Sequence, residues 1–212
     1  ARLRSRPAGR HDAPVCYSAG LARPRPDPLP GPLSAGHHVM RWFWIDRFEE
    51  FARCRRAVAV KCVSLAEEHL HDHFPGVGLM PNSLVLEGMA QTAGLLVADA
   101  IDFGRQVVLA KVAACEFQGD PIPGDVIRFE TEIQELTPEA AFVRATTSIA
   151  GAAHGTADLT FGLLEAGTVV PQIFSRGEMM RWLDQLHLFD VARDVDGSPI
   201  CRDRLADVDF GG

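Results

Sequence analysis

One stretch of the chain, residues 83–100, predicts a helix that is apolar on nearly every side. It reads SLVLEGMAQTAGLLVADA, without proline and without alternation of polar and apolar residues, and it is long enough for about five helical turns. Before Asp99, its strongly polar side chains are Glu87 and Gln91. A helix of this kind in a folded protein has to be enclosed by other structure. The rest of the chain must therefore supply a layer that wraps it.

Stretches of alternating apolar and polar residues predict that layer, because this alternation is typical of half-buried antiparallel strands. The clearest stretch is residues 127–134, where Ile127 and Phe129 face one way and Arg128 faces the other. Gly151 is expected to form the turn between the last two strands. The predicted strands are residues 58–62, 106–117, 127–134, 143–149 and 157–163.

Together these elements favour an α+β hot-dog fold, in which a curved antiparallel sheet is wrapped around one long central helix. No second helical layer is predicted nearby, so the sheet has to cover the helix. Small residues along the helix would let the strands approach closely; they are Gly88, Ala90, Ala93 and Gly94.

The two ends of the chain differ from this domain. Residues 1–39 hold seven of the fourteen prolines, a density that neither helices nor sheets tolerate. We expect a disordered or non-native leader over residues 1–39, a domain over 40–166 whose functional start is Met40, and a C-terminal extension over 167–212. In the extension, Met179, Leu183 and Leu186 predict a short helix within residues 175–188, and the chain beyond Arg193 is expected to be a loose end.

Composition excludes several classes of function. The net charge is −7 while the leader is rich in arginine, so the domain itself is acidic and a broad nucleic-acid-binding surface is not expected. The longest apolar run ends at Asp99, short of the roughly 18 residues of a membrane span. The five cysteines are scattered, which argues against a disulfide framework or a zinc site. We expect a cytoplasmic protein that spans no membrane.

Residues 69–91, HLHDHFPGVGLMPNSLVLEGMAQ, contain the most specific motif. The pattern is H-F-P-G, four residues, P, five residues and E-x-M-A-Q, so His73 lies fourteen positions before Glu87. It resembles the signature of FabZ-type (3R)-hydroxyacyl-ACP dehydratases. Further matches are Asp46-Arg47, residues 59–63, Glu116-Phe117 and Pro123-Gly124-Asp125, so the resemblance covers roughly residues 42–165. It implies the hot-dog fold and dehydration of hydroxyacyl chains on acyl carrier protein (ACP), in fatty-acid or related acyl or polyketide biosynthesis.

The pair of His73 and Glu87 suits the elimination of water. The reaction needs a base for the proton next to a thioester carbonyl and an acid for the departing hydroxyl. An imidazole titrates near pH ~6.5 and can accept a proton at cellular pH, so His73 is the expected base. The resemblance implies that Glu87 protonates the leaving hydroxyl. Glu87 must then hold a proton, and we expect Leu84, Leu86 and Met89 to favour this by excluding water.

The start of the helix is expected to supply the positive field for the developing oxyanion, because the first N–H groups of a helix lack intrahelical acceptors. The backbone of Asn82 and Ser83 lies there. The resemblance implies a glycine amide at the position of Asn82, and a proline at the position of Gly78. These two departures leave turn geometry and substrate preference open. The dehydratase-isomerase subfamily carries Asp at the position of Glu87, so isomerase activity is not expected.

Several residues have two readings. Leu79, Met80 and Phe117 either line an acyl tunnel or belong to the core, and Gln91 bonds either within the site or to buried backbone. His69, His71 and His73 would face one way on a strand and bind a metal, but nothing nearby completes a tetrahedral site, so no metal and no cofactor are expected. Residues 42–44 are expected in the core or in a dimer contact. The predicted substrate-binding residues are Phe74, Gly76, Leu79, Met80, Gln91 and Phe117.

Two other functions stay open beside the dehydratase: a hot-dog acyl thioesterase and a non-catalytic acyl-binding subunit. The resemblance implies a homodimer or a higher even-numbered homo-oligomer, with the histidine of one protomer facing the glutamate of its partner and the sheets joined edge to edge. The expected partner is ACP, which is acidic, so docking requires a local basic cluster. The expected contributors are Arg53, Arg55, Arg56 and Lys111.

Overall fold

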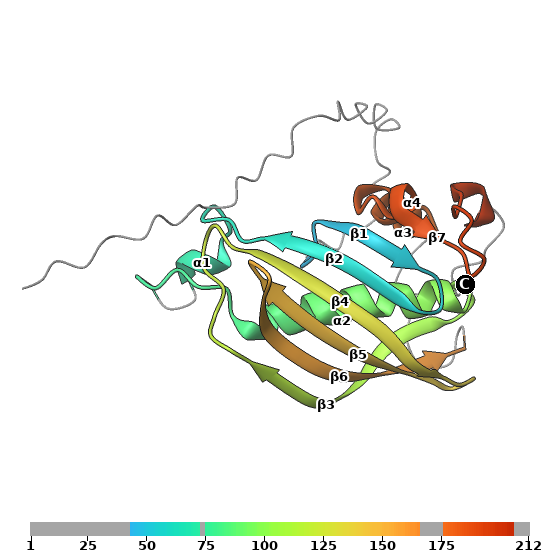
Figure 1. Ribbon diagram of the computed structural model, residues 1–212, viewed down its shortest axis with the longest axis horizontal. Helices are drawn as coiled ribbons and strands as arrows, with labels where there is room; N and C mark the ends of the chain where they lie inside the picture. Colours follow the sequence, from blue (N-terminus) through green and yellow to red (C-terminus); the bar gives the residue numbers. More distant parts are fainter. Residues whose placement is uncertain (1–42, 73–74, 166–175, 206–212) are drawn as a thin grey trace, which may run out of the picture. The chain divides into compact units, whose positions relative to one another are not determined.

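A seven-stranded sheet curves over one long helix in the computed structural model, which describes residues 43–72, 75–165 and 176–205 (Figure 1). The long helix is α2, Asn82–Ala100. The strands are β1 Arg47–Ala52, β2 Arg56–Cys62, β3 Gln106–Phe117, β4 Val126–Leu136, β5 Ala140–Ile149, β6 Ala152–Leu164 and β7 Ala192–Arg193. The predicted α+β hot-dog fold is confirmed.

The strand order is β3-β6-β5-β4-β2-β1-β7, and every pair is antiparallel except β1 with β7. The alternation predicted for residues 127–134 is confirmed, because Ile127, Phe129 and Thr131 are fully buried against the helix side. The turn between β5 and β6 lies at Ala150 and Gly151, both with positive φ. Gly151 adopts this conformation without the steric cost that a side chain brings.

Helix α2 starts directly after Pro81, whose carbonyl accepts the N–H of Leu84 at 2.9 Å. Gly88 then lets the sheet approach the helix. A Cβ atom at this position would lie 2.6 Å from Cζ of Phe129 and 2.9 Å from the backbone oxygen of Trp44. The expected role of the small residues is thus explained at Gly88, where any side chain would displace a core phenylalanine.

The expectation that the chain's own strands enclose α2 completely is wrong. Glu87 and Ser83 are exposed, and Leu84, Gln91 and Leu95 are only partly buried. These residues recur every three or four positions and so form one stripe along the helix. The sheet covers the opposite side. Glu87 is therefore exposed in the single chain, and Met89, which was expected to shield it, is buried in the core instead.

The C-terminal extension packs onto the β1 edge of the sheet. It contains α3 Arg176–Gln185, α4 Leu188–Val191, β7 and the 3-10 helix η1 Arg202–Leu205. The predicted short helix is confirmed, with Met179, Leu183 and Leu186 buried. The backbone oxygen of Leu186 accepts the N–H of Phe48 in β1 at 2.8 Å.

The expected loose end beyond Arg193 is wrong as far as Leu205. Ile200 and Leu205 are buried to 3% and 1% exposure, and Arg204 bonds to Asp99 at the end of α2. Two apolar residues among charged ones are enough to pack this segment against the domain. Their spacing follows no helical or strand period, so the sequence pattern did not predict the contact.

The expected leader, Met40 and Trp42 lie outside the described residues. Among the helices that the structure describes, none is both long enough and apolar enough to cross a bilayer.

Candidate active site

The motif residues gather at the end of the domain where α2 begins. There the start of α2 lies near α1, His69–Asp72, and the loop that joins β3 to β4 (Figure 1). His73 and Phe74 lie outside the described residues, so the predicted meeting of His73 with Glu87 stays a prediction. The other predicted site residues can be placed.

Glu87 lies in the second turn of α2 and is held by a side chain one turn further on. The amide nitrogen of Gln91 donates to Glu87 Oε1 at 3.0 Å. The amide oxygen of Gln91 accepts the backbone N–H of Trp44 at 2.9 Å. Gln91 therefore bonds both to the candidate acid and to backbone, which answers the question that the sequence left open.

Asn82 clamps the start of α2 to the loop after β3. Its Nδ2 donates to the backbone oxygen of Gly119 and to Oδ1 of Asp120, each at 2.9 Å. His154 Nε2 lies 3.3 Å from the same Gly119 oxygen, and its Nδ1 is 3.0 Å from Oγ1 of Thr147. A glycine at position 82 would lack these bonds, so the departure from the motif adds a contact that fixes the turn.

Sequence reasoning missed Asp120 and His154 as part of this network. His154 is buried to 4% exposure in β6, and its ring lies 5.6 Å from that of Phe117. The available signal was a histidine just before the alternating residues 157–163, but nothing in the sequence showed that this histidine is buried.

The predicted substrate-binding residues differ in burial. Met80 is fully buried in the core, and its N–H donates to the oxygen of Pro121 at 2.7 Å. Leu79 and Phe117 are partly buried, whereas Gly76 is exposed in a turn with φ of 87°. Ser83 is exposed at the helix start. Their contact with an acyl chain stays a prediction.

A chain of charged side chains, also missed by sequence reasoning, anchors α1 to the sheet. Lys61 is buried to 7% exposure and pairs with Glu67 at 2.5 Å and with Asp46 at 3.4 Å. The other oxygen of Glu67 lies 3.5 Å from Nε2 of His69. Lysine is rarely buried unless it is paired, so this network fixes the segment that precedes His73 in the sequence.

Two histidines of the motif, His69 and His71, do not lie on a strand. They belong to α1, where residues two apart point in different directions. The strand alignment that the metal-binding alternative requires is therefore not formed by these two. In residues 43–72, 75–165 and 176–205, no group of three His, Cys, Asp or Glu side chains is arranged to hold a metal ion.

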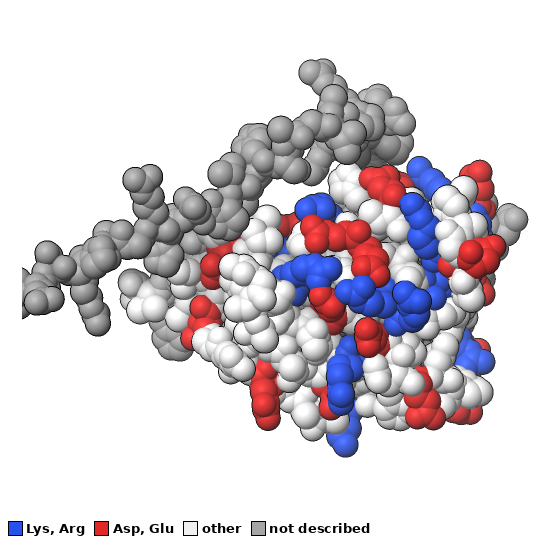
Figure 2. Space-filling view, viewed as in Figure 1, with Lys and Arg blue, Asp and Glu red and all other residues white. Residues whose placement is uncertain are grey.

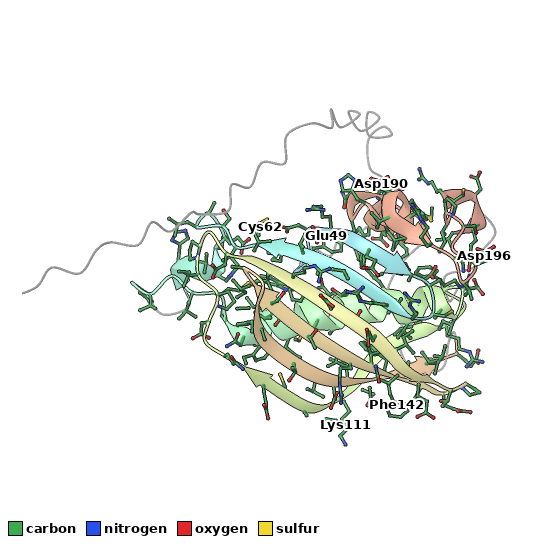
Figure 3. The ribbon with its side chains drawn as sticks, viewed as in Figure 1. Glu49, Cys62, Lys111, Phe142, Asp190 and Asp196 are labelled. Carbon is green, nitrogen blue, oxygen red and sulfur yellow. The ribbon has the colours of Figure 1, made fainter. Side chains whose placement is uncertain are left out.

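The expected basic cluster is also wrong. Arg53 pairs with Asp102 at 2.7 Å, and Arg56 pairs with Glu50 and Glu130 at 2.8 Å. Acidic and basic side chains lie next to one another across this face (Figure 2). Lys111 projects outward from β3 (Figure 3), which three strands separate from β2 and its Arg56. Arg56 is neutralised by acidic residues of the neighbouring strands β1 and β4, Arg53 is neutralised by Asp102 after α2, and Lys111 lies far from both.

Comparison with known proteins agrees with this architecture. The family model described as FabA-like domain matches residues 41–155. A 3-hydroxyacyl-(acyl-carrier-protein) dehydratase FabZ of Exiguobacterium sibiricum is 32% identical over 127 residues, which are 59% of this chain and 91% of the relative. The FabZ of Bacillus pumilus is also 32% identical, over 59% of this chain and 88% of the relative.

Among solved structures, smu.793 from Streptococcus mutans UA159 bound to acetyl CoA is similar with a TM-score of 0.48 and 15% identity, over 60% of this chain and 96% of that one. The match to the family model covers α2, its motif and most of the sheet. The chain belongs to the FabA-like family and is a FabZ-type hot-dog dehydratase.

Proposed function

We propose that this chain removes water from (3R)-hydroxyacyl thioesters carried on ACP and forms trans-2-enoyl thioesters. The observation that carries the proposal is the placement of Glu87, which lies near the start of α2, is held by Gln91 and is exposed on the side that the sheet leaves open. The relatives named above are dehydratases of 3-hydroxyacyl chains on ACP.

In the proposed reaction, His73 takes the proton from the carbon next to the thioester carbonyl. Negative charge then develops on the carbonyl oxygen, and N–H groups at the start of α2, at Asn82 and Ser83, stabilise it. Glu87 gives its proton to the hydroxyl group, which leaves as water. Of the two carboxylate oxygens, Oε1 accepts the bond from Gln91, so Oε2 is the candidate to carry the proton.

A protonated carboxyl group is favoured where water is excluded, yet Glu87 is exposed in the single chain. We propose that a second copy of the chain covers the stripe around Glu87. In the described part of the chain β3 pairs with β6 alone, which leaves one edge of a twelve-residue strand open. Leu109 and Val112 on this strand are each 37% exposed. An exposed edge of this length is a ready site for pairing with another strand.

The dimer is tested by analytical ultracentrifugation of the full chain and of Val112→Glu. We expect wild type to sediment as a dimer or a larger even-numbered assembly, and the variant to dissociate at least about tenfold more readily, because a charge is placed in an apolar contact. A monomeric wild type would contradict the proposal.

Because Arg53 and Arg56 are paired with acidic residues, docking of ACP has to use the remaining cations of the four that were expected. Arg55 is exposed beside Arg56 and borders a surface hollow with Glu130, Glu132 and Ile133. We propose that Arg55 contributes to docking. Arg55→Glu should then lower turnover of ACP-linked substrate and leave turnover of the coenzyme A form unchanged; equal effects on both would refute this role.

The reaction is tested by following the absorbance of an enoyl thioester during its reversible hydration, with ACP and coenzyme A forms side by side. Wild type should catalyse the hydration, and His73→Ala and Glu87→Gln should each lose most of the activity, on the order of 100-fold or more. Release of free thiol by wild type would indicate a thioesterase instead, and no turnover at all would favour an acyl-binding subunit.

A further inference from the structure

Trp44 contacts two parts of the candidate active site through two different groups. Its backbone N–H bonds to Gln91, which holds Glu87. Its ring meets the ring of His69 edge to face, with centroids 5.1 Å apart. His69 begins α1, which ends one residue before His73 in the sequence. We propose that Trp44 is a positioning residue that ties the orientation of Glu87 to the placement of α1. This inference rests on the proposed function, because it takes Glu87 as the catalytic acid.

The first contact fixes which way the amide of Gln91 points. A backbone N–H can only donate, so the group facing Trp44 must be the amide oxygen. The amide nitrogen of Gln91 is thereby directed at Glu87, 3.0 Å away. Were the amide reversed, two donors would face each other at Trp44 and the carboxylate would lose its donor. The position of the Trp44 backbone therefore sets the hydrogen bond on Glu87.

The segment around Trp44 has little freedom to move relative to α2. Gly88 allows a close approach, since a Cβ atom there would lie only 2.9 Å from the oxygen of Trp44. Two residues later the N–H of Asp46 bonds to Val60 at 2.7 Å, and Oδ2 of Asp46 accepts the N–H of Cys62, also at 2.7 Å. The segment is thus fixed between the helix and strand β2.

The second contact reaches α1 through a buried ring. Trp44 is 8% exposed, and an edge-to-face arrangement of aromatic rings is favourable beyond the burial of area. Nε2 of His69 also lies 3.5 Å from Oε2 of Glu67, which pairs with the buried Lys61. His69 is therefore held both by the Trp44 ring and by a carboxylate that is paired to the sheet, so loss of the ring removes a contact that places α1.

The consequence is that one residue sets both the hydrogen bond on Glu87 and the placement of α1, which directly precedes His73 in the sequence. A shift of about 1 Å in a catalytic group costs up to about 100-fold in rate. Loss of the Trp44 ring leaves its N–H in place but removes the contact with His69. The loss is thus expected in the chemical step rather than in binding of the thioester.

The test measures kcat and KM of the full chain for enoyl-thioester hydration in Trp44→Leu, Trp44→Phe and His69→Ala. We expect Trp44→Leu to lower kcat about 10-fold with KM changed less than about 2-fold, and Trp44→Phe to restore kcat to within about 3-fold of wild type. Because Trp44 and His69 act through one contact, the double variant Trp44→Leu/His69→Ala should lose no more than the worse single variant.

Phe51→Leu is the matched control. Phe51 is fully buried in β1 and forms an edge-to-face pair with Phe48, 5.2 Å between centroids. The Phe51→Leu variant removes a buried aromatic pair away from the motif, so this variant should lower stability without changing kcat. The inference would be overturned if Trp44→Leu, like this control, left kcat unchanged. It would also be overturned if the fold-loss in kcat of the double variant equalled the product of the two single losses. An inactive wild type would instead overturn the proposed function.

Discussion

An ion cluster at the C-terminal end of α2 joins three segments that are far apart in the sequence. The side chain of Asp99 is 2% exposed and accepts a bond from Nη1 of Arg204 in η1 at 2.9 Å. Nε of Arg53, in the turn between β1 and β2, lies 4.0 Å away on its other side. Both arginines also pair with Asp102. We predict that Arg204→Ala destabilises the chain, and that the loss depends on pH.

The size of the loss follows from the burial of Asp99. Removing one partner of a buried ion pair costs about 3–5 kcal/mol. Arg204 is 21% exposed and Arg53 remains nearby, so we expect a decrease of about 2–3 kcal/mol in the free energy of unfolding near pH 8.

The pH dependence follows from the protonation of Asp99. Burial raises the pKa of Asp99 from 3.8 to about 7, while the nearby Arg53 opposes the rise. Since the pKa of Asp99 in the folded chain lies above its ordinary value, the folded chain binds the proton more tightly than the unfolded chain does. The contribution of Asp99 to stability is therefore complete below about pH 4, falls as the pH rises to about 7 and is constant above that. Near pH 5.5 Asp99 is protonated and has little need of a cation, so Arg204→Ala should cost less than about 1 kcal/mol there.

The assay is urea unfolding of the full chain at about pH 8 and about pH 5.5, followed by tryptophan fluorescence. Arg202→Ala is the control, because Arg202 lies in the same short helix but is 61% exposed and pairs with Asp184 at the surface; it should change stability by less than about 1 kcal/mol at either pH. In an Asp99→Asn background, the cost of Arg204→Ala should shrink. An equal loss at both pH values, or one that persists in that background, would refute the reasoning.

Three further predictions concern close contacts elsewhere in the domain. Gly88→Ala should lower the free energy of unfolding by about 1–3 kcal/mol or more, measured by urea unfolding, because the added carbon lies 2.6 Å from the ring of Phe129. Gly155→Ala should give a similar loss and change near-ultraviolet circular dichroism, because its Cβ would lie 2.3 Å from the ring of Phe117. Asn82→Ala removes two hydrogen bonds to the loop after β3 and should raise amide hydrogen exchange in residues 118–120, with a loss of about 1–2 kcal/mol in the free energy of unfolding; unchanged exchange would count against the clamp.

The fold was predictable because its signals are local. The alternation along β4 and the apolar run of α2 each specify an element, and Gly151 marks the turn between β5 and β6, so little beyond pattern was needed. The motif likewise placed Glu87 and Asn82 at the start of one helix. These inferences depend on neighbours within a few positions.

The features that sequence reasoning missed depend on distant partners. The exposure of Glu87 depends on which side of α2 the sheet covers, and an apolar helix does not reveal this. The pairing of Arg56 with acidic residues depends on strand order, and that of Arg53 depends on how the end of α2 packs beside the turn between β1 and β2. Sequence reasoning therefore wrongly expected four cations to form a basic cluster. Arg204 bonds to Asp99, which lies more than a hundred positions away in the sequence. No periodic pattern predicts such a contact.

The C-terminal extension contacts the domain at two places, the ion cluster around Asp99 and the segment next to Trp44. Arg204 reaches Asp99 at the end of α2, whereas Trp182 of α3 meets Phe43 edge to face at 4.7 Å. Phe43 directly precedes Trp44, whose backbone holds Gln91. The matched family model ends at residue 155, so α3 and η1 lie outside the part that carries the motif. Since α3 nevertheless packs against the residue that precedes Trp44, and the backbone of Trp44 holds Gln91, we expect the extension to stabilise the geometry of the candidate site as well as the edge of the sheet.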